Sequence, residues 1–321
     1  MTIGKKIFKD YRIPALTVLL IVFLSFTKDL GLTRSAFLTT NNAFALLDSI
    51  PGYGIAAIGF TFVMLTGQLD ISFGSVMALT SCIFMMMLTA GVPFIVAFLA
   101  ALVLGCICGT ITGFFIASYR LSPFIVSMTM QLIYKGVALT ITNSTPVALA
   151  EPTLKAISKM RIFGIVPITF LLFIAIAIFA EFILRRTQYG RNMFLVGGNI
   201  SAADNLGIHV RNYIWSGFIV NGFCAALAGV FMMTRMFSAS GNLALDGPLN
   251  VIPMVIVGGT AMAGGKGGAI CTLFGMLLMN IIYNGMTMFS IPATIQELVK
   301  GLILLIIIVS DKYMEHRHEK I

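Results

Sequence analysis

Polar side chains that could form hydrogen bonds or bind a solute interrupt a long apolar segment at residues 65–75, which read LTGQLDISFGS. An amide, a carboxylate and several hydroxyls in lipid either satisfy the backbone groups that a helix break leaves open or line a cavity. Both interpretations stay open, because a break of this kind is itself tolerated only beside the interior of a bundle. The candidate residues for a helix break or translocation path are Gly67, Gln68, Asp70, Ser72, Gly74 and Ser75.

The apolar segment around this stretch is too long for one membrane crossing. It extends from about residue 43 to residue 90, whereas one crossing takes about 20 residues, so the chain must reverse near the middle. Gly67 is expected to end the first helix in a left-handed conformation. Asp70 is expected to begin the next helix by accepting the N–H of Ser72 or Phe73.

A second interrupted stretch, residues 251–273, reads VIPMVIVGGTAMAGGKGGAICTL. It is not a phosphate-binding loop, because the pattern G-x-x-x-x-G-K-[ST] would need glycine at Thr260 and a hydroxyl residue at Gly267. The sequence predicts a short or re-entrant helix, a glycine turn at the cytoplasmic face and a returning helix. Gly258 and Gly259 join the candidate residues for the path or break, since glycine-broken segments in both halves of a bundle indicate a pathway between them.

The connection at about residues 185–212 contains a third candidate element. The segment Ser201–Asp204 fits a capping box, and Gly207 fits the stop of a helix of about five residues. A helix that short is not stable alone in water, so it must dock either on its own bundle and the lipid headgroups or on a cytoplasmic partner. Small side chains such as Ala203 are expected to fit a partner's cleft.

Residues for catalysis or metal binding are not grouped in this sequence. The three histidines fall in connections, and no nucleophile–base pair or metal-ligand cluster is apparent. The five cysteines lie in apolar runs and are interpreted as packing residues. The chain is therefore not expected to be an enzyme. The ionisable residues within apolar runs are Asp48, Lys135, Glu181 and Lys300, of which Lys135 and Glu181 are expected to pair or to reach the interface.

Composition identifies the elements that must position these residues. The chain has 321 residues, of which 58% are hydrophobic and only 10% charged, whereas soluble proteins carry about 25% charged residues. The class is an integral membrane protein, and residues 1–321 are expected to form a single transmembrane domain. The net charge of +9 lies mostly between apolar runs, so nucleic acid is not an expected partner.

Ten apolar runs predict an all-α, polytopic membrane bundle of about ten transmembrane helices. The first run is expected to extend into its flanks, and the eighth is too short to span alone. The runs are Pro14–Phe26, Ala43–Thr66, Ile71–Ala90, Val92–Ser118, Pro123–Thr142, Phe163–Leu184, Tyr213–Thr234, Asn250–Met262, Gly268–Met288 and Ala293–Ser310.

The distribution of lysine and arginine predicts that both termini are cytoplasmic, because basic residues concentrate in cytoplasmic connections. The predicted inner segments hold Lys5, Lys6, Lys9, Arg12, Arg120, Arg185, Arg186, Arg191, Arg211, Lys266, Lys312, Arg317 and Lys320. The predicted outer segments hold the smaller set Lys28, Arg34, Lys155, Lys159, Arg161 and Arg235.

Small residues also recur at helical spacing. Gly105, Gly109 and Gly113 are four apart and share one helix face, and Gly222 and Ala226 repeat the pattern. In lipid, such faces allow helices to approach closely, so these residues are interpreted as packing residues.

Three stretches together resemble the ribose-type monosaccharide permeases of ABC importers. LTGQLDISFGSVMALTS is similar to a family signature written near G-G-I-D-L-S-V-G-S, from which the chain departs at Gln68 and Phe73. GRNMFLVGGNISAADNLGIHV resembles the family's cytoplasmic coupling segment, and VIVGGTAMAGGKGG resembles its late glycine-rich signature. The resemblance covers almost the whole chain, with the three motifs in the family's order.

The resemblance implies the type II ABC importer permease fold in a bacterial plasma (inner) membrane. Two permease subunits, either identical or paralogous, would enclose one path, with two ATP-binding cassette subunits docked below and a sugar-binding protein outside. ATP and Mg would bind to the ATPase subunits, so no cofactor is expected on this chain. The outer connections at residues 143–162 and 237–249 would contact the binding protein, and the residues implied in coupling to the ATPase are Gly197, Asn199, Ser201, Ala202, Ala203, Asp204 and Gly207.

The predicted function is therefore inward translocation of a ribose-like sugar, driven by ATP hydrolysis on a separate subunit. A sister ABC permease for nucleosides or branched-chain amino acids would have the same architecture and would be distinguished by its binding protein. A stand-alone secondary carrier or channel would transport without any ATPase.

Overall fold

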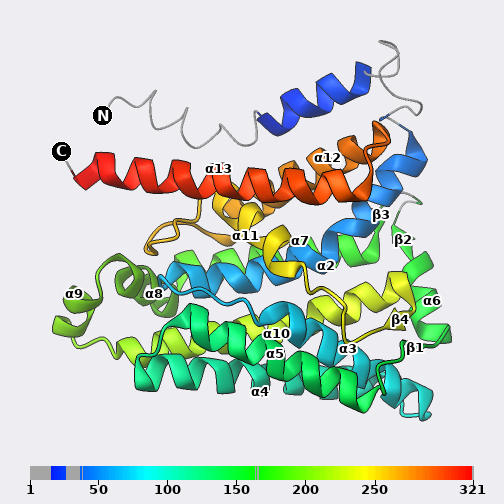
Figure 1. Cartoon of the computed structure of the whole chain (residues 1–321), viewed down its shortest axis with the longest axis horizontal. Helices are drawn as coiled ribbons and strands as arrows, with labels where there is room; N and C mark the ends of the chain where they lie inside the picture. Colours follow the sequence, from blue (N-terminus) through cyan, green and yellow to red (C-terminus); the bar gives the residue numbers. More distant parts are fainter. Residues whose placement is uncertain (1–15, 27–36, 38, 163, 165, 320–321) are drawn as a thin grey trace.

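A computed structural model describes residues 16–26, 37, 39–162, 164 and 166–319 of the chain, and helices make up almost all of it (Figure 1). A short apolar helix covers Leu16–Ser25. The other helices are α2 (Thr40–Leu65), α3 (Phe73–Thr89), α4 (Phe94–Tyr119), α5 (Pro123–Ile141), α6 (Pro152–Lys159), α7 (Ile168–Arg186), α8 (Gln188–Gly198), α9 (Ile200–Asn205), α10 (Val210–Met236), α11 (Gly247–Val257), α12 (Ala269–Met288) and α13 (Ala293–Glu319).

The fold is an all-α, multi-pass membrane bundle, as predicted. Among the described residues, α2, α4, α5, α7, α10 and α12 are long and apolar enough to cross a bilayer. Every predicted apolar run contains a helix, and α11 is too short to span alone, which confirms the prediction for the eighth run. The flanks into which the first run was expected to extend lie outside the described residues.

Helix α10 forms the centre of the bundle, where it packs against α4, α2 and α3. The small-residue face predicted on residues 105–113 makes the contact between α4 and α10. A Cβ atom at Gly105 would overlap the carbonyl oxygen of Gly222, and one at Gly113 would lie 2.7 Å from the Cβ of Phe218. The absence of side chains therefore sets the distance between the two helices, as the spacing predicts.

Replacing Gly105 with alanine is expected to lower the yield of folded, monodisperse protein. The new methyl group would force two helix backbones apart, and overpacking of this kind costs about 1–3 kcal/mol. Gly136→Ala is the matched control, because a Cβ atom at Gly136 on α5 meets nothing within 4 Å. Size-exclusion profiles and thermal unfolding of both variants check the prediction, which fails if the two behave alike.

Helices α4, α5 and α7 expose many large apolar side chains. Ile95 and Val103 on α4, Leu132 on α5, and Ile178 and Phe179 on α7 are all more than 45% exposed. An apolar surface this extensive is unsuited to water and fits the acyl chains of a bilayer.

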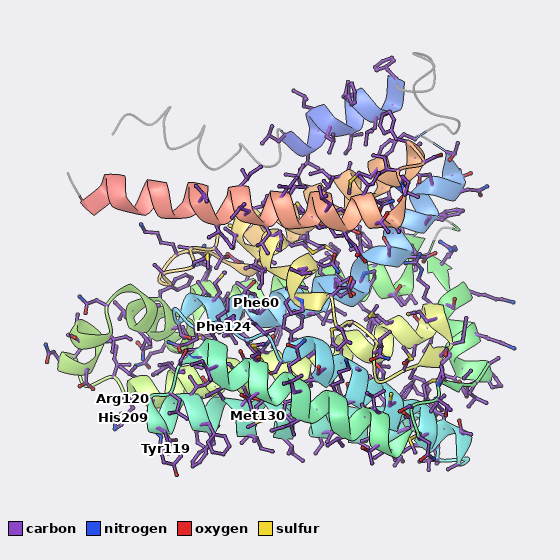
Figure 2. The ribbon with its side chains drawn as sticks, in the orientation of Figure 1. Phe60, Tyr119, Arg120, Phe124, Met130 and His209 are labelled. Carbon is purple, nitrogen blue, oxygen red and sulfur yellow. The ribbon has the colours of Figure 1, made fainter. Side chains whose placement is uncertain are left out.

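The two ends of the bundle differ in structure. Helices α8 and α9 project from the end at the left of Figure 1, and the same end carries Arg120 and His209 (Figures 1 and 2). The opposite end carries α6 and four two-residue strands, of which β1 (Val147–Ala148) pairs antiparallel with β4 (Ser238–Ala239). The other pair is β2 (Arg161–Ile162) with β3 (Val166–Pro167). The pairing of β1 with β4 joins the two connections that were expected to meet a binding protein.

Two helices are broken inside the bundle. The chain returns from the end of α2 as a non-helical segment, and α3 begins near the middle of the bundle (Figure 1). Helix α11 runs for 11 residues and ends at a glycine-rich turn, from which α12 returns. The predicted reversal near residue 67 is confirmed, and so is the predicted short helix, glycine turn and returning helix at residues 251–273.

Candidate functional site

The three sequence stretches that carry the family resemblance meet at one point. The carbonyl oxygen of Leu65, the last residue of α2, accepts the N–H of Gly265 at 3.0 Å. Gly264 and Gly265 adopt φ values of 85° and 71°, the left-handed region that favours glycine. The turn after α11 is thereby bonded to the end of α2, close to the end of α8.

No side chain fits at this point. A Cβ atom at Gly197, near the end of α8, would overlap the carbonyl oxygen of Leu65 and lie 2.6 Å from the nitrogen of Gly265. A Cβ atom at Gly264 would lie 2.7 Å from the nitrogen of Gly67. We call Gly67, Gly197, Gly264 and Gly265 the glycine junction; it brings three backbones to a separation that only glycine permits.

An ion pair connects α7 to the same region. The Nε of Arg185 donates to Glu181 at 2.9 Å, and its Nη2 donates to the carbonyl oxygen of Gly267 at 2.8 Å. The second oxygen of Glu181 accepts the N–H of Ile270 in the first turn of α12, at 3.2 Å. Glu181 therefore pairs, as expected, and also stabilises the start of α12 through the helix dipole.

The break between α2 and α3 has the predicted chemistry. Gly67 adopts a φ of 72° just after α2 ends. The Oδ1 of Asp70 accepts the N–H of Ser72 at 2.8 Å and its hydroxyl at 2.6 Å. Helix α3 then begins at Phe73. The stop at Gly67 and the hydrogen bond from Ser72 to Asp70 are confirmed, but Asp70 is not the N-cap of α3; that position is Ser72.

Asn221 completes this site and was not predicted. Its Nδ2 donates to the Oδ2 of Asp70 at 2.8 Å, from the middle of the central helix α10. Both residues are almost fully buried, with exposed fractions of 3% for Asp70 and 0% for Asn221. An amide alone within an apolar helix is the signal that could have indicated a polar partner across the bundle.

The other candidate residues of the two breaks make close backbone contacts, adopt a left-handed φ or donate a hydrogen bond to the backbone. A Cβ atom at Gly74 would overlap the carbonyl oxygen of Ala244, so the start of α3 lies against the segment that leads into α11. Gly258 contacts α12 closely, and Gly259 has a φ of 103°. Gln68 is half-buried and donates to the carbonyl oxygen of Thr66 at 3.3 Å.

The short helix α9 exists, but its start differs from the prediction. Its N-cap is Asn199, whose side chain accepts the N–H of Ala202 at 2.9 Å. Ser201 lies inside the helix, so the predicted capping box at Ser201–Asp204 is wrong; Asn199 supplies an equally favoured cap two residues earlier. The predicted stop is confirmed, because Gly207 adopts a φ of 74° after the helix ends.

The side chain of Ala203 does not lie on an exposed face. It is fully buried, in a cluster with Val63, Val196 and Phe218 of the same chain. The expectation that Ala203 fits a partner's cleft is therefore wrong for this residue, which docks α9 on its own bundle. The exposed surface of the segment consists of Ile200, Ser201, Ala202, Asp204, Asn205 and Leu206.

Comparison with known proteins gives one family match. The family described as "branched-chain amino acid transport system / permease component" matches residues 42–308. The chain belongs to this family of ABC importer permeases.

Individual relatives of the permease cover most of its length. The ribose import permease protein RbsC of Escherichia coli (strain K12) is 32% identical over 86% of this chain and 87% of its own. The L-arabinose ABC transporter permease protein AraH of Azospirillum brasilense is 28% identical over 93% and 88%. The D-allose transport system permease protein AlsC of Escherichia coli (strain K12) is 29% identical over 88% and 86%. No solved structure matches the permease in this comparison.

Helix α8 of the permease was also not predicted, although Met193 and Val196 lie at helical spacing on its buried face. Tyr189 on this helix shares a hydrogen bond of 2.8 Å with Ser216 of α10. Burial raises the pKa of the Tyr189 hydroxyl, so this bond persists at neutral and moderately alkaline pH. In the part of the permease that the structure describes, no group of His, Cys, Asp and Glu could hold a metal ion.

Proposed function

We propose that this permease imports a neutral monosaccharide, driven by ATP hydrolysis on a separate subunit. The single observation that carries the proposal is the glycine junction, in which the backbone of α8 lies in close contact with the end of α2 and with the turn after α11. A displacement of α8–α9 would move the ends of α2 and α11 directly, because no side chain lies between the backbones to absorb it. The sugar class is supported by the relatives named for ribose, arabinose and allose.

The proposal extends to the assembly around the permease. Two copies, identical or paralogous, enclose the path in a bacterial plasma membrane, and ATP and Mg bind to the partner subunits alone. Both termini lie on the cytoplasmic side, which is also the side of α9. This orientation is supported by α13, which runs toward the end of the bundle that carries α8 and α9 (Figure 1). The opposite end, where β1 pairs with β4, receives the sugar-binding protein.

The ATPase is proposed to dock on the exposed surface of α9. Leu206 and Ile200 are 69% and 51% exposed there, beside the carboxylate of Asp204. Ile200 begins this helix of 6 residues and Leu206 is its C-cap residue, and two large exposed apolar side chains on so short a segment are typical of a small anchor that fills a partner's pocket. The residues between Gly197 and Gly207 that the resemblance implies in coupling thus have three positions. Gly197 belongs to the glycine junction, Asn199 caps α9, and the exposed residues of α9 form the proposed docking surface.

Leu206→Arg is expected to weaken ATPase binding at least about tenfold, or about 1.4 kcal/mol, because it places an unpaired cation in an apolar contact. The yield of folded permease should not change, since this side chain is exposed. Co-purification with the ATPase subunit and ATP-dependent uptake in proteoliposomes measure the effect. Met160→Arg is the matched control for ATPase co-purification alone, because Met160 is 53% exposed at the opposite end of the bundle. Full ATPase binding by Leu206→Arg would contradict the proposal.

A second candidate function is import of branched-chain amino acids, which the family description names. Uptake of a panel of sugars, nucleosides and amino acids by the assembled transporter distinguishes the two. A stand-alone carrier, the third candidate, would keep transporting when the Walker lysine of the ATPase subunit is replaced.

A further inference from the structure

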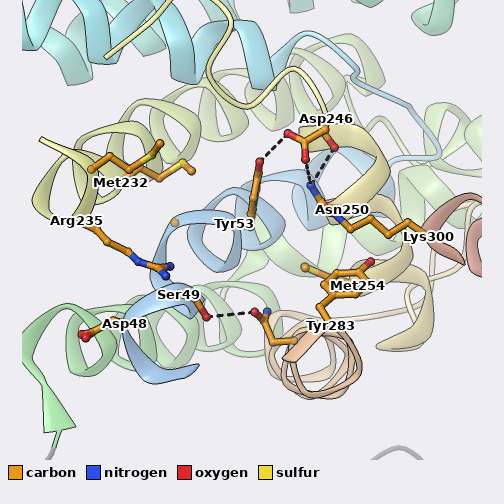
Figure 3. Close-up of a pocket in the computed structure, with 13 residues that line it drawn as sticks. Asp48, Ser49, Tyr53, Met232, Arg235, Asp246, Asn250, Met254, Tyr283 and Lys300 are labelled. Carbon is orange, nitrogen blue, oxygen red and sulfur yellow. Dashed lines mark hydrogen bonds between the residues drawn. The ribbon is translucent and has the colours of Figure 1, made fainter. Parts of the chain in front are cut away.

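A cavity of about 490 Å³ opens among α2, α10, α11, α12 and α13, in the half of the bundle away from α9. Its volume lies within the range of about 300–1,000 Å³ typical of small-molecule sites. Aspartate, asparagine, tyrosine, arginine and lysine side chains line it, although the helices that carry them are apolar (Figure 3). Within a membrane, such side chains are costly and usually mark a solute pathway.

One wall of the cavity is held in place by hydrogen bonds. The Oη of Tyr53 donates to one oxygen of Asp246 at 2.9 Å, and the Nδ2 of Asn250 donates to the other at 2.6 Å (Figure 3). Asp246 is the N-cap residue of the broken helix α11. Discontinuous helices supply substrate sites in other transporters, because their ends offer polar groups inside the bundle.

The opposite wall contains a polar atom without a partner. The hydroxyl of Tyr283 is buried and makes no hydrogen bond with any residue that the structure describes. The Nζ of Lys300 lies 5.0 Å from the centroid of the same ring. A buried hydroxyl without a partner is costly, so one that lines a cavity is well placed to bind a polar solute.

The lining carries both signs of charge. Asp48 is already paired with Arg161 at 2.9 Å, and Asp246, Arg235 and Lys300 also line the cavity, so an anion or a cation would each meet a like charge there. A sugar carries no charge, and its hydroxyls both donate and accept hydrogen bonds. The mixture of carboxylate, amide and hydroxyl groups supplies acceptors and donors for it.

We propose that this cavity is a binding site for the neutral monosaccharide during its passage, with Tyr283, Asp246 and Asn250 as its hydrogen-bonding residues. The inference rests on the proposed function, because it takes the solute class from there. It adds the residues that contact the sugar within the permease itself, rather than within an external binding protein.

The test measures sugar binding directly in the assembled transporter. Ser49 lines the cavity, so a thiol reagent should modify Ser49→Cys, and ribose, arabinose or allose should protect it. The matched control is Ser216→Cys, which lines a different cavity beside Tyr189 and Tyr213 and should not be protected. Labelling of the unchanged protein, with its five cysteines, is subtracted.

Tyr283→Phe in the Ser49→Cys background tests the site residue. Loss of the Tyr283 hydroxyl should raise the sugar concentration that gives half-maximal protection about threefold to tenfold, the range for one hydrogen bond. The yield of folded protein should not fall. Tyr134→Phe is the matched control, because that hydroxyl donates to the carbonyl oxygen of Cys108 at 2.8 Å, outside the cavity. It should leave the half-protecting concentration unchanged.

The possible failures are distinguishable. ATP-driven sugar uptake without protection of Ser49→Cys, or with equal protection in Tyr283→Phe, would overturn the cavity assignment and leave the proposed function intact. Protection by leucine but not by any sugar would overturn the sugar class. Absence of ATP-driven sugar uptake by the unchanged transporter would overturn the proposed function, and the inference with it.

Discussion

Gly197→Ala is expected to abolish ATP-driven uptake and to reduce the yield of folded permease. The added Cβ atom would overlap the carbonyl oxygen of Leu65, the same atom that accepts the N–H of Gly265. Because both neighbours are backbone atoms, neither can rotate away, and the cost is expected at or above the upper end of the range of about 1–3 kcal/mol for overpacking. Thermal unfolding in detergent and uptake in proteoliposomes measure the two effects.

The adjacent residue provides a strict control. A Cβ atom at Gly198 meets nothing within 4 Å, although Gly198 belongs to the same helix, α8. Gly198→Ala should therefore keep both stability and uptake, and alanine is the better helix former. Equal behaviour of the two variants would show that the glycine junction does not depend on the close approach seen here.

Asp70→Ala is expected to destabilise the permease by several kcal/mol. The substitution removes the acceptor for the N–H and hydroxyl of Ser72 and for the amide of Asn221, all within the bundle. Each buried donor left without a partner costs about 1–3 kcal/mol. This exceeds the 0.5–2 kcal/mol of an ordinary helix cap, which is what the sequence alone predicts for this residue. Folded yield and thermal unfolding are the measurements.

Asp70→Asn should be much milder. Its amide oxygen can still accept from Ser72, and its amide nitrogen can donate to the Oδ1 of Asn221, which is buried and has no partner in the structure. If the side-chain amide of Asn221 turns by half a turn, its oxygen can accept this bond. The side-chain nitrogen of Asn221 is then the one group of this site left without a partner. If Asp70→Asn folds normally but loses uptake, the residue acts in the pathway and not only in the break.

The sequence predicted the elements of this permease better than their contacts. Apolar runs located the helices, and turn chemistry located the reversal at Gly67 and the stop at Gly207, because both depend on neighbouring residues only. The meeting of Gly67, Gly197 and Gly264 depends on residues far apart in the chain. No local pattern reports such a contact, although Gly67 and Gly197 were individually candidates.

The same limit explains the errors at the coupling segment and the cavity. Ser201 and Asn199 are both good N-cap residues, and only the packing of Ala203 on Phe218 and Val196 decides where α9 begins and which face is buried. In the cavity, Asp48 and Lys300 stood out as ionisable residues in apolar runs. Tyr53, Asn250 and Tyr283 did not, because their role arises from helices that converge from five parts of the chain.

The two half-length helices have an electrostatic consequence for the membrane in which they lie. Helices α3 and α11 both begin inside the bundle, where the positive ends of their dipoles would otherwise face a medium of low dielectric constant. Each start has a carboxylate beside it: the buried Asp70, which accepts from Ser72 in front of α3, and the exposed Asp246, the N-cap residue of α11. Each carboxylate lies where the helix dipole favours negative charge. Replacing either one would therefore weaken the start of its half-length helix.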